Sequence, residues 1–143
     1  MRVELYRDPA AFDTLREEWD ALLARSAFDT LFLRPAWLGT WWQVFGREGA
    51  LRIVAVRDGR GNLVAVAPLF LAPLMADARQ PVPDLSYERP VPQPSATPHE
   101  TLLFVGGTEV TDYLDFVVER TQAPEVYKAL FAAVLEEGGW EWI

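Results

Sequence analysis

The sequence predicts a single α/β domain, residues 1–143, in which helices and short strands share one core. Two observations carry this prediction. Half of the 143 residues are apolar and 13% are aromatic, so the chain can bury a core of its own. Apolar residues recur at helical spacing in three segments, and β-branched runs lie between them. The predicted order, β-α-α-β-β-β-β-α-β, indicates a mixed α+β sheet rather than regular βαβ alternation.

The N-terminal segment predicts a strand and then an amphipathic helix. Residues 3–6 alternate in polarity, as a short strand does. Asp8 and Pro9 suit the cap and first turn of a helix. The apolar side of that helix consists of Phe12, Leu15, Trp19, Leu22 and Leu23.

A second helix, begun by Pro35 and ended by Gly46, is the most aromatic part of the chain. Trp37, Trp41 and Trp42 lie on one broad apolar stripe, which predicts packing beneath a sheet. In the alternative interpretation, these rings form a wall on which a sugar stacks. Trp41 and Trp42, at the edge of the stripe, are therefore the candidates for substrate binding.

A β-hairpin follows the aromatic helix. Residues 51–56 and 63–70 are nearly continuous β-branched runs, which indicates strands covered on both faces. Asp58-Gly59 and Gly61-Asn62 supply the residues that a tight turn requires. Pro68 has no N–H to donate, so we expect a bulge, an edge or the end of the strand there.

The second half of the chain predicts an irregular insertion, two strands and a helix. Residues 73–98 hold seven of the eleven prolines and form the insertion, while residues 101–105 and 113–118 suit strands. Pro124 opens the last helix. Its predicted buried side consists of Val126, Tyr127, Leu130, Phe131, Val134 and Leu135. A strand begun at Trp140 stops at once, and its edge predicts a partner, either a missing C-terminal half or a second copy of the chain.

Composition excludes several classes of function. A net charge of −8 disfavours nucleic acid and anionic membranes as main partners. The chain has no cysteine and one histidine, His99, so we expect no thiolate or two-histidine metal site. The N-terminus lacks an apolar signal core, which predicts a cytoplasmic protein.

In its order of elements, the chain resembles the first part of a GNAT acetyltransferase. It is most similar to the CelD-like branch, named for cellulose-biosynthesis proteins and related to FemAB-type acyltransferases. The segments that carry the resemblance are residues 12–23, 32–38, 41–42, 64–69, 112–115 and 139–140. The resemblance implies a GNAT-like fold, incomplete at its C-terminus. Family members are typically more than twice this length, so the chain looks like the N-terminal half of one.

The resemblance also implies where acyl-CoA should bind. GNAT enzymes hold the CoA pyrophosphate on a glycine-containing link between the fourth strand and the next helix. Here residues 119–125 contain no glycine, and Pro124 removes a donor. Between residues 106 and 125, Arg120 faces five acids, Glu109, Asp112, Asp115, Glu119 and Glu125. We therefore expect this half to bind no cofactor, with acetyl-CoA or another acyl-CoA used by the complete enzyme.

The remaining site candidates are few. Asp112 and Asp115 flank Tyr113, and a carboxylate there could deprotonate an amine or orient the tyrosine; turn capping is the structural alternative. His99, beside Glu100, could be a general base or substrate ligand, or a solvated loop residue. Two functions follow. The chain is either the front part of an acyl-CoA-dependent N-acyltransferase acting on an amino group of a sugar or cell-envelope precursor, or a non-catalytic module for ligand binding or assembly.

Overall fold

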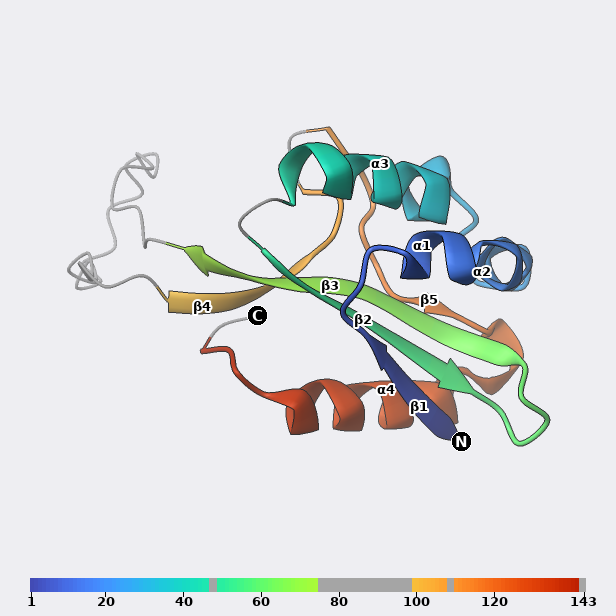
Figure 1. Ribbon diagram of the computed structural model, residues 1–143. Helices are drawn as coiled ribbons and strands as arrows, with labels where there is room; N and C mark the ends of the chain where they lie inside the picture. The colour runs from blue at the N-terminus through green and yellow to red at the C-terminus, as the bar shows by residue number, and fades with distance from the viewer. Residues whose placement is uncertain (47–48, 75–98, 108–109, 142–143) are drawn as a thin grey trace, which may run out of the picture.

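The computed structural model describes residues 1–46, 49–74, 99–107 and 110–141. They form a sheet between two helical layers (Figure 1). The elements are β1 (Arg2–Tyr6), α1 (Ala11–Thr14), α2 (Arg16–Leu23), η1 (Leu31–Leu33), α3 (Pro35–Phe45), β2 (Ala50–Arg57), β3 (Leu63–Leu74), β4 (His99–Phe104), β5 (Val117–Val118), η2 (Arg120–Gln122) and α4 (Ala123–Glu137).

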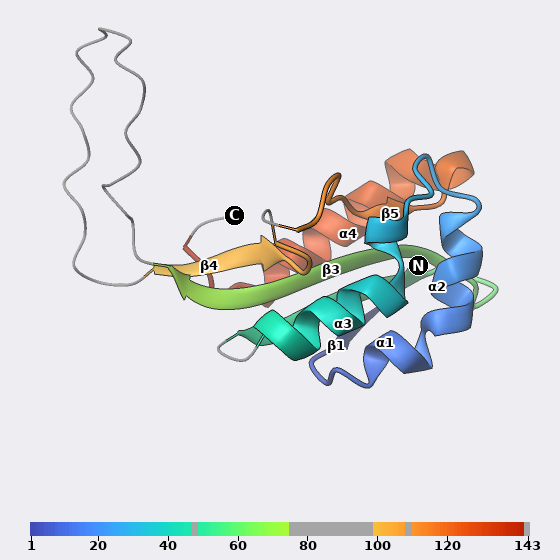
Figure 2. The same cartoon turned by 90° about the horizontal axis from the view of Figure 1, so that it is seen from above.

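The sheet has the order β1-β2-β3-β4, and β5 also pairs with β3. Every pairing among the described strands is antiparallel. Helices α1, α2 and α3 cover one face of the sheet, whereas α4 alone crosses the other (Figures 1 and 2). The predicted α/β class is confirmed at this level.

Each face of the sheet has its own apolar core. Trp19, Leu22 and Leu38 are fully buried between the three N-terminal helices and the sheet. On the opposite face, the fully buried core residues of α4 are Val126 and Leu130. Because most strand residues contribute to one core or the other, β2 and β3 are apolar on both sides, as their sequence runs predict.

Local signals in the sequence predict the helices and the hairpin. Pro35 occupies the first turn of α3, and Gly46 follows its last residue. In the hairpin turn, the Asp58 carboxylate accepts hydrogen bonds from the Arg60 and Asn62 N–H groups, and Gly61 has φ +88°. These short-range interactions need no tertiary partner.

Two predictions about strands and burial are wrong, and a third concerns residues that the structure describes only in part. The strand expected over 113–118 is reduced to β5, since the chain reaches the sheet only at Val117. Phe131 and Leu135 of α4 are 46% and 63% exposed rather than buried, because the sheet contacts only one side of the helix. Most of the proline-rich segment 73–98 lies outside the described residues.

The strand expected at Trp140 is not formed at residues 140–141, and residues 142–143 are not described. The chain nevertheless returns to the sheet there. The Glu141 N–H donates to the Glu100 carbonyl of β4 at 2.7 Å. This backbone hydrogen bond places the C-terminal segment beside β4.

Candidate functional site

The most irregular feature of the sheet is an interruption between β4 and β5. Both strands pair with the same side of β3, with Phe104 opposite Leu69 and Val117 opposite Val66. Val105 N–H donates to the Pro68 carbonyl at 2.8 Å, but Pro68 has no N–H to return. The ladder cannot continue symmetrically here. β3 runs on through Pro68 and neither ends nor bulges there, so these two expectations are wrong. The irregularity near Pro68 is instead the gap between β4 and β5 on this side of β3.

Between β4 and β5 the chain leaves the sheet. We call this segment, described at residues 106–107 and 110–116, the excursion. It is fastened to α3 by a buried relay of hydrogen bonds. Trp37 Nε1 donates to Thr111 Oγ1 at 3.1 Å, and Thr111 Oγ1 donates to the Gly106 carbonyl at 2.6 Å. Thr111 is 6% exposed, so the relay is shielded from water. The excursion therefore has a defined conformation at its base.

Tyr113 stands at the exposed side of the excursion. Its φ is +55°, a value otherwise confined among the described residues to glycines. For a non-glycine residue this backbone conformation is strained. Strained residues of this kind are frequent at functional sites. The side chain is 81% exposed, so packing does not explain the strain. Tyr113 cannot belong to the predicted strand with this backbone conformation.

The two carboxylates beside Tyr113 have different surroundings. Asp112 is exposed, whereas Asp115 is half-buried and accepts a hydrogen bond from the Phe116 N–H at 2.7 Å. Burial first, and the nearby Asp115 charge second, raise the pKa of Tyr127 on α4. Asp115 thus lies toward the α4 side of the sheet. Burial and the Asp115 charge both favour the protonated form of the Tyr127 phenol.

An aromatic cluster anchors the returning part of the excursion. The ring centroids of Phe104 and Phe116 lie 5.1 Å apart, and those of Phe116 and Phe131 lie 5.5 Å apart in an edge-to-face arrangement. Tyr127 stacks on Phe131 with a centroid separation of 6.1 Å. These contacts join β4, the excursion and α4. They hold Asp115 and Tyr127 in the same neighbourhood.

Trp41 and Trp42, the predicted substrate-binding residues, are half-buried and pack on Phe70 of β3. Each indole ring lies 5.6 Å from the Phe70 ring, measured between centroids. Gly107 lies against Trp41, and a Cβ there would come within 2.9 Å of Trp41 Cζ2. Both tryptophans therefore pack α3 onto the sheet, and Trp41 also contacts the excursion at Gly107. Core packing, the structural alternative in the sequence, accounts for most of their surface.

The link from β5 to α4 was the position at which the resemblance places a CoA pyrophosphate. Its Arg120 N–H donates to the Arg25 carbonyl, and its Gln122 N–H donates to the Glu119 carbonyl. Glu119 is itself 8% exposed and accepts from Arg25 Nε at 2.6 Å. Two N–H groups are thus engaged, Pro124 has none, and a buried carboxylate lies beside them. These residues do not fit a diphosphate.

A second charged cluster joins α2 to the edge of the sheet. Arg57 donates from Nε to Glu4 at 2.9 Å and from Nη2 to Glu18 at 3.0 Å. The Arg57 hydrogen bonds, partly offset by burial, lower the pKa of Glu18. For Glu4, burial opposes the shift, but the Arg57 and Tyr6 hydrogen bonds outweigh it and lower the pKa. Both carboxylate oxygens of Glu4 and of Glu18 accept hydrogen bonds from neighbouring side chains, which is typical of a structural network.

The structure leaves other candidates without a site. The side chain of His99 lies outside the described residues, although its backbone pairs with Leu74. Within the described ranges, no group of three or more histidine or acidic side chains could hold a metal ion. No helix in that part of the chain is long and apolar enough to cross a bilayer.

Three residues of this region were not predicted as functional. Trp37 and Thr111 lie 74 positions apart, and nothing in either segment predicts their hydrogen bond. Tyr127, predicted on the buried side of its helix, is half-buried, and the charge of Asp115 contributes to its raised pKa. In the sequence, only Pro68 indicates an irregularity in this region. It does not indicate that the chain leaves the sheet between β4 and β5.

The comparisons with known proteins assign no family. No family model matches the chain, and no curated protein matches it. Among solved structures, the chain is similar to a crystal structure of a mutant of the BH1408 protein from Bacillus halodurans, at 13% sequence identity. The match covers 100% of this chain and 80% of that chain, with a TM-score of 0.49. We draw no functional conclusion from a similarity of this size.

Proposed function

We propose that the chain is a GNAT-like part of an N-acyltransferase, and that the excursion binds the amine that accepts the acyl group. One observation carries the proposal. The interrupted strand presents Tyr113 in a strained, exposed conformation between two carboxylates, Asp112 and Asp115. The resemblance to CelD-like proteins supports the choice of reaction, with a sugar or cell-envelope precursor as the source of the amine.

The chemistry of the excursion suits a protonated amine. Two carboxylates attract an ammonium group, and the face of an exposed tyrosine ring adds a cation–π contact worth about 0.5–1 kcal/mol at such a surface. Asp115 would accept a proton as the amine is acylated. Tyr127, whose pKa is raised, would remain a hydrogen-bond donor to the acceptor.

The engaged N–H groups and the buried Glu119 make the link that the resemblance indicates a poor site for the diphosphate of an acyl donor. The engaged N–H groups of Arg120 and Gln122 favour the second candidate, a GNAT-like module that binds a ligand or assembles without catalysis. In both proposals the excursion recognises a cationic group. They differ in whether an acyl group is transferred.

Amine recognition can be tested by titrating the ¹⁵N-labelled chain with glucosamine and, as the neutral control, with glucose. We expect saturable shifts at the amides of residues 110–117 with glucosamine alone. Asp115→Asn should weaken binding several-fold, because it removes a full charge while keeping the shape. The matched control is Asp29→Asn, which removes the same charge from an exposed carboxylate in the segment before η1. Equal responses to both sugars would refute amine binding.

A second measurement separates the two candidates. Calorimetry with acetyl-CoA, followed by an assay for released thiol in the presence of glucosamine, reports donor binding and transfer. Binding of the donor together with thiol release supports an enzyme. Amine binding without either supports the module.

A further inference from the structure

Helix α4 carries an apolar stripe on the side that faces away from the sheet. Val126, Leu130 and Val134 are buried, yet Phe131 and Leu135 are 46% and 63% exposed. Ala132 is exposed as well, on the flank of the helix that borders the edge strand β1. A helix that is apolar on more than its core-facing side is typical of one that is covered on both sides.

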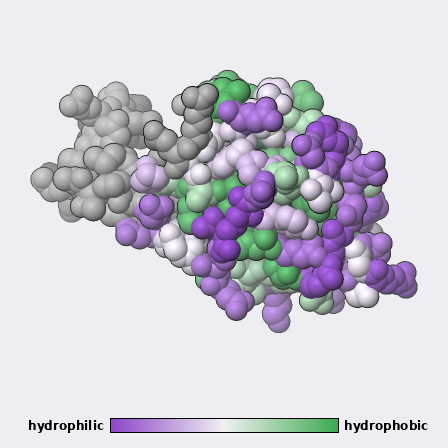
Figure 3. All heavy atoms as spheres, in the orientation of Figure 1, coloured by the Kyte–Doolittle hydropathy of each residue, from purple (hydrophilic) through white to green (hydrophobic). Residues whose placement is uncertain are grey.

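The neighbouring surface is a groove of about 480 Å³ between α4 and the edge strand β1. Its lining residues are Val3, Leu5, Val54, Ala129, Ala132, Ala133, Glu136 and Glu137. Apolar surface is visible there in Figure 3, between polar side chains. The groove exists because one helix cannot span the whole face of the sheet. Alanines on its α4 side permit a second helix to approach closely.

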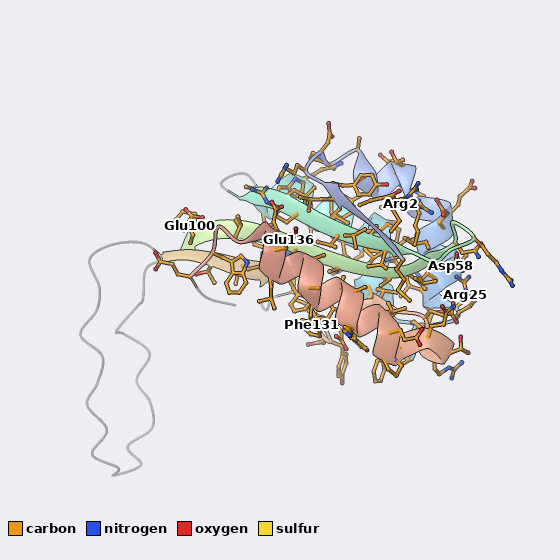
Figure 4. The ribbon with its side chains drawn as sticks, turned by 90° about the horizontal axis from the view of Figure 1, so that it is seen from below. Arg2, Arg25, Asp58, Glu100, Phe131 and Glu136 are labelled. Carbon is orange, nitrogen blue, oxygen red and sulfur yellow. The ribbon has the colours of Figure 1, made fainter. Side chains whose placement is uncertain are left out.

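Two opposite charges frame the outer side of α4. Lys128 and Glu136 are both exposed, and among the residues that the structure describes neither forms an ion pair. Figure 4 shows Phe131 and Glu136 on different flanks of the helix. Lys128 and Glu136 lie four residues to either side of Ala132, on the same side of the helix.

We propose that this outer side of α4 is an interface between two copies of the chain, with α4 of each copy packed antiparallel on the other about Ala132. A two-fold axis at this position brings Lys128 of one copy level with Glu136 of the other, and repeats the pair by symmetry. Leu135 of one copy then lies level with Ala129 of the other, which lines the groove. In this register the Lys128–Glu136 pairs are complementary in both copies.

The interface is small, because a helix of 15 residues is about 22 Å long at 1.5 Å per residue. Each copy also carries a net charge of −8. We therefore expect weak, concentration-dependent association in the micromolar range rather than a permanent dimer. This inference does not depend on amine binding by the excursion.

A charge exchange tests the register. Lys128→Glu and Glu136→Lys each replace two attractive contacts with two repulsive ones, and each should weaken dimerisation about tenfold in sedimentation velocity at physiological salt. The double variant Lys128→Glu/Glu136→Lys restores complementarity and should regain the affinity of the natural sequence. Glu17→Lys and Arg60→Glu, at exposed positions on α2 and the hairpin turn, are the controls for charge alone.

The design separates local pairing from net charge. Glu136→Lys makes the chain less acidic, so general repulsion between copies would predict tighter association, whereas the proposed register predicts weaker association. Circular dichroism melts verify that each variant is folded. A natural sequence that stays monomeric at millimolar concentration would overturn the proposal. So would a dimer that is indifferent to the single changes, or one that the double variant fails to restore.

Discussion

Replacing Trp19 tests the packing of the larger core. Its side chain is 0% exposed, and its ring lies 6.1 Å from that of Phe12 between centroids. Trp19→Ala removes the indole from the centre of the core formed by α1, α2, α3 and the sheet. Because the surrounding backbone cannot collapse fully into the space, we expect a loss of about 3–5 kcal/mol in the free energy of unfolding.

A second variant at the same position isolates the polar part of the indole. Trp19 Nε1 is buried and has no hydrogen-bond partner among the described residues. Such an unsatisfied donor costs about 1–3 kcal/mol. Trp19→Phe keeps an aromatic ring and removes that donor, so the smaller cavity penalty is partly offset. We expect a net loss of about 1–2 kcal/mol, less than half that of the alanine variant.

The assay is urea unfolding followed by far-ultraviolet circular dichroism, which does not depend on tryptophan emission. Val44→Ala, at a position 57% exposed on α3, is the control and should change stability by less than about 0.5 kcal/mol. A loss below about 1 kcal/mol for Trp19→Ala would contradict its place in the core. If Trp19→Phe were as costly as Trp19→Ala, the donor would have a partner.

Two further predictions concern the charged network and the excursion. The Arg57 hydrogen bonds lower the pKa of Glu18, so its contribution to stability is complete above the ordinary value of 4.5 and is lost as the pH falls below it; Glu18→Gln should therefore lower the unfolding midpoint at neutral pH but not in acid. Gly107 has φ +61° and touches Trp41, so Gly107→Ala should cost about 1–3 kcal/mol in urea unfolding. Gly59→Ala, with open space at its Cβ, should cost far less, and equal losses would contradict the close contact.

Local chemistry made parts of the fold predictable. Pro35, the Asp58 turn and the spacing of apolar residues identify α3, the hairpin and α4 without any knowledge of distant contacts. The core assignment of Trp19 follows from the same spacing. Pro68 also indicated an irregular ladder, because a missing N–H is a property of the residue itself.

The candidate site could not be predicted in the same way. Residues 113–118 have the composition of a strand, but Tyr113 takes a positive φ, and the excursion is tied to α3 through Thr111 and Trp37. Arg25 and Glu119 likewise pair across 94 positions. Such contacts depend on where the fold brings two segments together. The sequence of either segment does not identify the other.

The class of the fold, helices α3 and α4 and the hairpin follow from the sequence alone, as does an irregularity of the sheet near Pro68. Each of these depends on interactions within a few residues of the chain. The departure of the chain from the sheet between β4 and β5 could be seen only in the three-dimensional structure. The same is true of the exposure of Phe131 and Leu135. Those outcomes depend on which faces the neighbouring elements cover, because one helix cannot cover a five-stranded sheet.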